Sequence, residues 1–215
     1  GGNMKPKVKP YTIVTFADDN IATSQTPDAG GAQSFTLNGD ITAGGVLVVQ
    51  ELAYIIAFTC AANDSGRTLT ITGTDADGAA QTEAVTGGNA GVVVSAKFFR
   101  SISGITTDAD TAGAIEIGTV ATTLVAQTPT YALDIYQPDT SVAVDVSGTI
   151  NYTLLKCFER PTAGDALNFV AGGLAAGTGD RNTAYTGPTG GIRLQINTYS
   201  NGATASMTIA QSRHT

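Results

Sequence analysis

The stretch "TLTITGTDADGAAQTEAVTG", residues 68–87, decides the fold class because two alternating segments flank a short acidic turn. In the first segment Leu69 and Ile71 face one side and threonines face the other, which is typical of a half-buried β-strand. Asp77-Gly78 lies between the segments, and hairpin turns favour this pair because both residue types tolerate a left-handed backbone. The stretch therefore predicts a β-hairpin.

The same acids could instead belong to a calcium-binding loop. With Gly78 placed at the glycine of the EF-hand pattern, Asp75 and Asp77 fall on ligand positions. Gly73 then holds the first ligand position and Ala84 holds that of the bidentate glutamate, so two ligands are missing. The flanks also alternate as strands, whereas an EF-hand loop lies between helices. The hairpin interpretation is therefore favoured.

A second copy of the acidic pattern occurs at Asp108 and Asp110. No glycine follows until Gly113, so this copy fits the calcium pattern less well. We expect turns at both copies, with no metal site and no cofactor. Whether Asp75 with Asp77, or Asp108 with Asp110, binds an adventitious cation stays open at this point.

The rest of the chain repeats the alternation. Of its 215 residues, 42% are hydrophobic and 13% are charged, whereas a charged share of about 25% is usual. Short alternating runs, cut by Gly, Asp and Asn, follow one another with almost no helical periodicity. The sequence predicts an all-β protein with two β-sandwich domains in tandem, of immunoglobulin-like or jelly-roll-like type.

Changes in composition divide the chain. We expect an extended basic N-terminal arm over residues 1–12, a first sandwich over 13–120 and a second over 121–215. Residues 124–140 contain two prolines and are predicted to form a linker that leads into an edge strand. Residues 171–191 are rich in glycine and are predicted to form a long loop, a feature that is usually functional or ordered by a partner.

Two further segments of the second domain carry strand patterns. Residues 141–158, "SVAVDVSGTINYTLLKCF", are either a hairpin or one long strand bent at Gly148. Residues 192–211, "IRLQINTYSNGATASMTIAQ", predict a hairpin in which Asn201-Gly202 forms a tight type I′ turn.

Lysines and prolines alternate in "MKPKVKPY", residues 4–11. Proline disfavours helix here, so the arm is expected to be extended. It is either a solubilising tail or an element that reaches an acidic neighbour. Met4 is expected to mark the native start, which makes Gly1 to Asn3 an expression scar.

The net charge of −7, from 18 acids and 11 bases, argues against nucleic-acid binding, which depends on neutralising phosphates. The longest apolar stretch, residues 52–62, is about half of the ~20 residues that a membrane-spanning helix needs. No apolar region of signal-peptide type follows the basic start. We therefore expect a soluble protein without a membrane or nucleic-acid partner.

Few residues offer catalytic chemistry. The single histidine, His214, is the penultimate residue, so a hydrolase triad or a clustered zinc site is not expected. Cys60 and Cys157 are expected to be buried free thiols, although the sequence leaves a disulfide open. The glutamates that a glycosidase would pair are scattered along the chain: Glu51, Glu83, Glu116 and Glu159. We expect no enzymatic activity.

Residues 64–91, "DSGRTLTITGTDADGAAQTEAVTGGNAG", and residues 97–119, "KFFRSISGITTDADTAGAIEIGT", together resemble a module of virion structural proteins of tailed bacteriophages. In that module a "TITGTDADG" hairpin precedes an aromatic strand and a closing "GT" segment. Residues 141–154 and 192–211 resemble the module that commonly follows it. The chain departs from the pattern at "ERPTAGDALNFVAGG", residues 159–173, and in the glycine-rich insertion.

The resemblance implies a non-enzymatic component of a phage particle and carries over no catalytic residues. We expect a protein that decorates or cements the capsid by contacts with the major capsid protein or other virion subunits. A homo-oligomer is expected, with a trimer favoured because it matches local threefold axes of a capsid. The alternatives are a tail or head-fibre adhesin that binds a host glycan or protein, and an enzyme such as a depolymerase.

Partner contacts are expected at seven residues. The basic arm would act as the anchor on an acidic shell. Phe98 and Phe99 point to opposite faces of a strand, so one ring is expected in the core and the other on the outer face. An exposed ring beside Lys97 and Arg100 would contact another subunit, and the alternative is that a loop of the protein itself covers this face. Tyr185 is the aromatic residue of the glycine-rich loop. The predicted contact residues are Lys5, Lys7, Lys9, Tyr11, Phe99, Arg100 and Tyr185.

Overall fold

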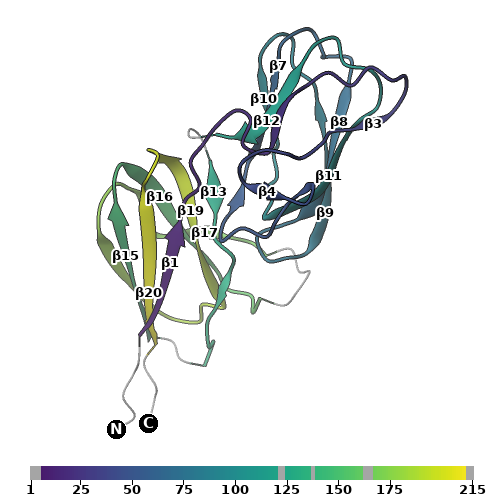
Figure 1. Ribbon diagram of the computed structural model, residues 1–215. Helices are drawn as coiled ribbons and strands as arrows, with labels where there is room; N and C mark the ends of the chain where they lie inside the picture. Colours follow the sequence, from purple (N-terminus) through teal and green to yellow (C-terminus); the bar gives the residue numbers. More distant parts are fainter. Residues whose placement is uncertain (1–5, 121–123, 137–138, 162–166, 212–215) are drawn as a thin grey trace. The chain divides into compact units, whose positions relative to one another are not determined.

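The computed structural model describes residues 6–120, 124–136, 139–161 and 167–211 (Figure 1). The described residues form strands, turns and bends and contain no helix, and the strand pairings within each of the two units described below are antiparallel. The prediction of an all-β fold built from sandwich-like layers is confirmed. No helix in the described ranges is long and apolar enough to span a membrane.

The chain divides into two compact units. One unit comprises Thr15–Ala121, and we call it the inserted unit. The other comprises Gly1–Val14 together with Thr122–Thr215, and we call it the terminal unit. The predicted boundary near residue 120 agrees with the division between residues 121 and 122. The predicted boundary between residues 12 and 13 lies near the division between Val14 and Thr15. The segment before it is not a separate arm, however, because it belongs to the terminal unit.

Two sheets build the inserted unit. The first has the order β10 (Val92–Val94), β7 (Ile56–Cys60), β12 (Ile115–Thr119) and β2 (Ala22–Gln25). The second has the order β4 (Thr42–Ala43), β5 (Val46–Leu47), β11 (Ser101–Thr107), β8 (Thr68–Thr74) and β9 (Ala80–Thr86), and β3 (Gln33–Ser34) also pairs with β11. A short strand, β6 (Ala53–Tyr54), makes a bridge with Phe99.

Alternating apolar residues place the core of this unit between the two sheets. Leu69 and Ile71 on β8 are fully buried, as their spacing predicts, and so is Ile105 on β11. The first sheet contributes Phe58 and Ile117, which are also fully buried. Each such side chain contributes about 1.5–3 kcal/mol on burial, so these rows hold the layers together.

The hairpin predicted from residues 68–87 is present. Strands β8 and β9 pair in unbroken register from Thr68 opposite Thr86 to Thr74 opposite Ala80. The loop spans residues 75–79, and Gly78 takes the left-handed conformation with φ of +89°. The loop is longer than a two-residue turn. It is closed by a hydrogen bond in which the Asp75 backbone N–H donates to the Ala79 carbonyl at 2.9 Å.

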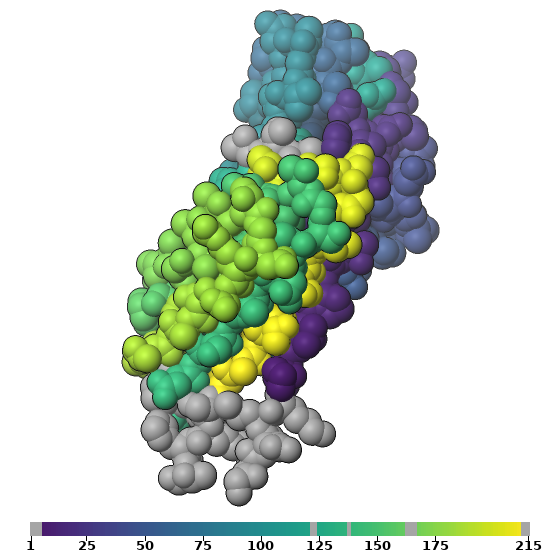
Figure 2. Space-filling view, turned by 90° about the vertical axis from the view of Figure 1, so that its left-hand side faces the viewer, coloured from purple at the N-terminus to yellow at the C-terminus, as the bar shows by residue number. Residues whose placement is uncertain are grey.

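Two sheets also build the terminal unit. One has the order β1 (Lys7–Thr12), β20 (Thr204–Gln211), β15 (Asp139–Ser147) and β18 (Arg181–Thr186). The other contains β17 (Val170–Gly177), β16 (Ile150–Cys157), β19 (Gly191–Tyr199) and β13 (Ala126–Gln127), and β14 (Tyr131–Ala132) pairs with β19. Figure 2 shows the first sheet as neighbouring strips, with β1 in purple beside β20 in yellow.

The N-terminal arm is a strand of this sheet over its described residues. Lys7–Thr12 pairs with β20 along its whole length, from Lys7 opposite Ile209 to Thr12 opposite Thr204. Ile13, which follows, is 4% exposed, and the Tyr199 hydroxyl donates to the Val14 carbonyl at 2.7 Å. The prolines predict extension correctly, but the prediction of a separate arm is wrong here because β20 offers an unpaired edge.

The glycine-rich loop predicted over residues 171–191 is also not a loop. Most of it forms β17 and β18, which lie in different sheets and are joined by a short turn. Glycines are needed where the backbone approaches rings, since a Cβ on Gly177 would meet the Tyr152 ring at 2.6 Å. The predicted linker, residues 124–140, likewise contains β13 and β14, and its residues 137–138 lie outside the described part.

The segment from residue 141 to 158 is neither a hairpin nor a single bent strand. Its strands β15 and β16 belong to opposite sheets, and the chain crosses between the sheets at Gly148, where φ is +81°. The second predicted hairpin, residues 192–211, is not present, because β19 and β20 follow one another in the chain but belong to opposite sheets and do not pair with each other. Of the Asn201-Gly202 pair only Gly202 has positive φ, so the turn is not type I′. Cys60 and Cys157 are buried free thiols, as predicted.

Candidate interaction surfaces

The Asp75 side chain of the first motif binds backbone groups. The Asp75 carboxylate accepts from the backbone N–H groups of Asp77 and Ala79, each at 2.9 Å. This is the arrangement by which Asp stabilises a turn, because its side chain replaces a backbone acceptor. Within the described ranges no group of three or more His, Cys, Asp or Glu residues is arranged to hold a metal ion.

The acids of the second motif connect loops. Asp108 accepts from the Thr68 backbone N–H at 2.9 Å, and this bond lowers the pKa of the exposed Asp108 carboxyl below its usual value. Asp110 accepts from the Gly30 N–H at 2.8 Å and from the Gln33 side-chain amide at 2.7 Å. Both carboxylates therefore join the loop after β11 to distant parts of the inserted unit.

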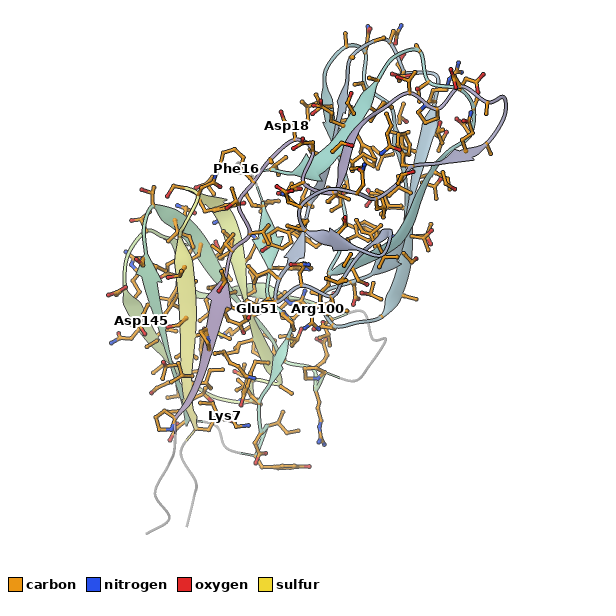
Figure 3. The ribbon with its side chains drawn as sticks, in the orientation of Figure 1. Lys7, Phe16, Asp18, Glu51, Arg100 and Asp145 are labelled. Carbon is orange, nitrogen blue, oxygen red and sulfur yellow. The ribbon has the colours of Figure 1, made fainter. Side chains whose placement is uncertain are left out.

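Of the predicted basic contact residues, Lys7 and Lys9 lie on β1, and Lys7 is labelled in Figure 3. Lys7 and Lys9 are exposed, and the Lys7 ammonium lies 5.5 Å from the centroid of the Tyr131 ring on β14. Tyr11 is half-buried on the same strand. Lys5 lies outside the described residues. The lysines thus occupy one edge of the terminal sandwich, where Lys7 also contributes a cation–π contact between its two sheets.

Phe99 and Arg100 do not form an exposed contact pair. Phe99 is fully buried and exchanges two backbone hydrogen bonds with Tyr54, each at 2.8 Å. Arg100 is half-buried, and its side-chain Nε donates to the Gln50 carbonyl at 2.8 Å. The prediction for Phe99 is wrong because its ring takes the core side of the strand, and Phe98 is the half-buried member of the pair.

Tyr185 is not an exposed loop residue either. It lies on β18, is 7% exposed, and its hydroxyl donates to the Gly172 carbonyl. Burial raises the pKa of the Tyr185 phenol to about 12. Its ring contributes to a surface cluster, because the Lys156 ammonium lies 4.9 Å from its centroid and 5.3 Å from that of Phe158.

This cluster is the aromatic surface that the sequence analysis did not identify. Phe158 is 57% exposed and lines a depression of about 370 Å³ together with Lys156 and Tyr185. Phe158 directly follows the end of β16. In the sequence, this surface was indicated by an aromatic residue that breaks the alternation of the strand. A half-exposed ring with a cation beside it can stack against a planar or sugar-like group.

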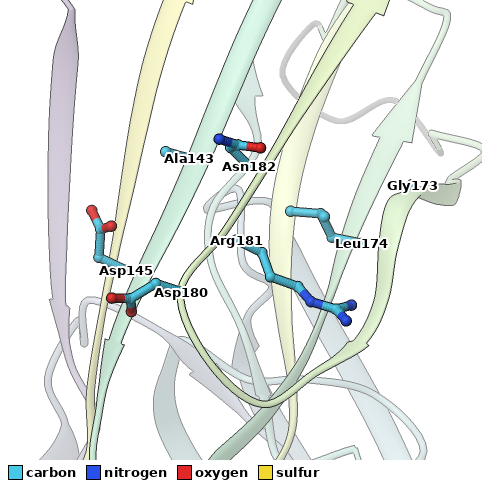
Figure 4. A pocket seen from close by; sticks show the side chains of 7 residues that line it. All are labelled: Ala143, Asp145, Gly173, Leu174, Asp180, Arg181 and Asn182. Carbon is cyan, nitrogen blue, oxygen red and sulfur yellow. The ribbon is translucent and has the colours of Figure 1, made fainter.

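A second, wider depression of about 590 Å³ lies on the terminal unit (Figure 4). Asp145 and Asp180 line one side, and the Arg181 side chain extends across it (Figure 4). Asp180 is engaged with backbone, since its carboxylate accepts from the Val146 N–H at 2.8 Å. The depression is open, and Asp180 joins the turn between β17 and β18 to β15, so it is a polar surface rather than a built ligand site.

Comparisons with known proteins give distant structural neighbours. No protein-family model and no curated protein sequence matches the chain. Among solved structures, the PBSX exported protein XepA is similar at 14% identity and a TM-score of 0.28, over 88% of this chain and 85% of that chain. The tandem CBM22-1 and CBM22-2 domains of Paenibacillus barcinonensis Xyn10C are similar at 10% identity and a TM-score of 0.28, over 98% of this chain and 93% of theirs. At this TM-score neither neighbour carries an argument about function.

Proposed function

We propose that this chain is a non-enzymatic structural protein of a bacteriophage particle that decorates or cements the capsid through contacts between subunits. One observation carries the proposal. The segment from residue 64 to 119, which resembles a phage virion module, folds as a contiguous part of the inserted unit from β8 to β12. Three of its conspicuous acids, Asp75, Asp108 and Asp110, accept hydrogen bonds from backbone N–H groups.

The proposed partners are the major capsid protein or other virion subunits, and the proposed assembly is a homo-oligomer, with a trimer favoured. Closed symmetric assemblies are the rule for such proteins, and a trimer matches local threefold axes. The experiment is electron microscopy of the parent particle with a label on this chain. We expect the label over the capsid shell. A label on the tail, or none on the particle, would contradict the decorating function.

The lysines of β1 are the proposed anchor, and their test must keep the strand. Deleting residues 4–10 would also remove the pairing partner of β20, so loss of binding would be ambiguous. We therefore propose the double substitution Lys7→Gln and Lys9→Gln, which keeps the backbone pairing. Its charge-matched control is Arg160→Gln with Arg181→Gln, two exposed cations of the same unit. Reduced occupancy on particles for the lysine pair alone would support the anchor.

A fibre or tail adhesin that binds a host glycan is the second candidate, and the exposed Phe158 favours it. Its ring beside Lys156 offers a platform on which a sugar could stack. The test is binding of the chain to host surface glycans, compared between Phe158→Ala and Phe16→Ala, an exposed ring of the inserted unit. Loss of glycan binding in Phe158→Ala alone would favour the adhesin over the capsid function.

Catalysis is not part of the proposal. Glu83, one of the carboxylates that a depolymerase would use, accepts from the backbone N–H groups of Ala96 at 2.6 Å and Lys97 at 2.9 Å. A carboxylate bound in this way stabilises a loop and is poorly placed to act as a general acid. Depolymerase activity that is lost on Glu83→Gln or Glu116→Gln would contradict the non-enzymatic function.

A further inference from the structure

Strand β10 is an edge strand with unused hydrogen-bonding groups. It pairs with β7 on one side, from Val92 opposite Thr59 to Val94 opposite Ala57. The flanking bonds run from the Cys60 N–H to the Gly91 carbonyl at 3.0 Å and from the Ser95 N–H to the Ile56 carbonyl at 2.8 Å. Because bonding residues alternate along an antiparallel strand, Val93 bonds to β7 and the N–H and C=O groups of Val92 and Val94 point outward.

The opposite edge of the same sheet is closed by side chains. On β2 the outward N–H of Thr23 donates to the Asn38 side-chain oxygen at 3.0 Å. The Thr23 carbonyl accepts from the Gln25 side-chain amide at 3.2 Å. These amides take the place of a neighbouring strand, so an incoming strand would have to displace them.

Two other edge strands, β9 and β1, are protected by charges or proline, which oppose pairing with another chain. The outward Thr82 carbonyl of β9 accepts a hydrogen bond from the Lys97 ammonium at 2.8 Å. On β1 the edge carries Lys7, Lys9 and Pro10. Strand β10 has neither device: its residues are three valines, and Val92 and Val94 are 59% and 49% exposed.

We propose that β10 pairs antiparallel with β10 of a second copy of this chain, about a twofold axis that passes through Val93. In this register Val92 of each copy lies opposite Val94 of the other, and both are hydrogen-bonded pairs. All the outward N–H and C=O groups of the two strands are then satisfied. A shift of the axis by one residue, to Val92 or Val94, leaves half of these groups unpaired.

The residues of the strand favour a second copy as the partner, because three successive valines pair with themselves about a twofold axis. The net charge of −7 opposes association of two copies, and β10, which carries no charge, adds nothing to that repulsion. The exposed valines also bring apolar side chains face to face across the axis, which β-branched residues favour. With only three residues on each side the pairing is weak, and it forms at high local concentration.

The pairing is independent of the proposed capsid function, because it depends only on the backbone and side chains of the isolated chain. It adds a twofold contact that is distinct from the proposed trimer. Its failure would leave the particle-labelling test unaffected, and a label on the tail would leave this pairing unaffected.

The test is sedimentation velocity of the purified full chain up to a concentration on the order of 1 mM, with hydrogen exchange of single amides. We expect a concentration-dependent dimer and slower exchange of the Val92 and Val94 amides as it forms. Val94→Lys adds a charge at the edge, and Val94→Pro removes an outward N–H that β7 does not use. Each is expected to weaken association by at least about tenfold and to leave the melting temperature close to that of the wild type.

The matched control is Val49→Lys, because Val49 is 65% exposed in the same unit but lies outside any strand. This variant should associate like the wild type. A chain that stays monomeric at every concentration would overturn the pairing. Association that survives either substitution at Val94, or is lost equally in Val49→Lys, would overturn it as well.

Discussion

Aspartate side chains act as backbone acceptors at the turns of the inserted unit. Asp75 closes the β8–β9 turn, and Asp64 accepts from the Ala112 N–H at 2.6 Å although it is 1% exposed. Charge-assisted bonds of this kind are stronger than neutral ones, and they offset part of the cost of placing a carboxylate near the core, since the second oxygen of Asp64 is buried without a hydrogen-bond partner in the described structure. Acids at these positions thus stabilise the loops. The sequence that resembles a calcium-binding loop therefore uses its Asp75 carboxylate to bind two backbone N–H groups.

Removing the Asp75 carboxylate should destabilise the protein. Asp75→Ala leaves the N–H groups of Asp77 and Ala79 without their acceptor, and we expect the free energy of unfolding to fall by about 1–2 kcal/mol. Chemical denaturation measures this change. The control is Asp40→Ala, an exposed aspartate for which the described structure gives no side-chain hydrogen bond, and it should change stability by less than about 0.5 kcal/mol. Equal effects in the two variants would contradict the capping function.

Because burial raises the pKa of the Tyr185 phenol, we expect the free energy of unfolding to fall at high pH. The native phenol keeps its proton up to a pKa of about 12, because burial disfavours the phenolate. The unfolded chain ionises near pH ~10, so unfolding becomes more favourable as the pH rises from about 10 towards 12. Tyr185→Phe should flatten this part of the stability curve, measured by denaturant unfolding at stepwise pH. At neutral pH it should cost about 1 kcal/mol from the lost bond to the Gly172 carbonyl.

The matched control for Tyr185 is Tyr136→Phe, since Tyr136 is 82% exposed. This control should leave both the alkaline slope and the neutral-pH stability unchanged. An alkaline slope that persists in Tyr185→Phe would show that another group controls it.

At the scale of elements, close contact between strands depends on glycine at particular positions. A Cβ at Gly73 on β8 would overlap the Ser101 carbonyl oxygen of β11, which is backbone and cannot rotate away. Gly104 on β11 has open space around the corresponding position. The irregular register between Ile102 and Gly104 brings the two strands together here.

These two glycines give a matched pair of substitutions. We expect Gly73→Ala to lower the free energy of unfolding by about 2–3 kcal/mol, because β8 and β11 must separate to admit the methyl group. Gly104→Ala should change it by no more than about 0.5 kcal/mol in either direction. Thermal and chemical denaturation of both variants would measure the difference. A Gly104→Ala variant that is as unstable as Gly73→Ala would contradict the assigned contact.

At the scale of the whole molecule, one unit is inserted into the other. The terminal unit takes β1 from the start of the chain and its remaining strands from the second half. Strand β1 runs along Met207 and Ile209, which are 0% and 4% exposed. The first residues therefore belong to a sheet that the rest of the chain completes only after the inserted unit.

This arrangement predicts different behaviour for excised pieces. Residues 15–121 form a contiguous unit with its own core and should fold alone. Residues 122–215 without the N-terminal segment should be strongly destabilised, because β20 loses its partner and the apolar row around Met207 becomes exposed. Restoring residues 6–14 through a short flexible linker after residue 211 should recover a cooperative melt by circular dichroism. A stable 122–215 fragment would contradict the assignment of β1.

Much of the local structure was predictable because it depends on neighbouring residues. Alternation in residues 68–87 gave the β8–β9 hairpin, and alternation in residues 192–211 gave the strands β19 and β20, since the side-chain period of a strand is a local property. That these two strands join opposite sheets and form no hairpin depended on distant partners. The buried free thiols and the buried row of Leu69 and Ile71 followed in the same way. Exposure at the predicted contact residues was harder to predict, because Phe98 and Phe99 have equal hydrophobicity and only the opposing sheet selects which ring is buried.

By itself the sequence determined the all-β class, the acidic turn at residues 75–79 and a boundary near residue 120, because these follow from period, turn chemistry and composition. Tertiary structure alone decided that Lys7–Thr12 is a strand, that the glycine-rich region forms β17 and β18, and that β10 keeps open hydrogen-bonding groups. The physical reason is that a strand is stabilised by its partner, and the partner lies far away in the sequence.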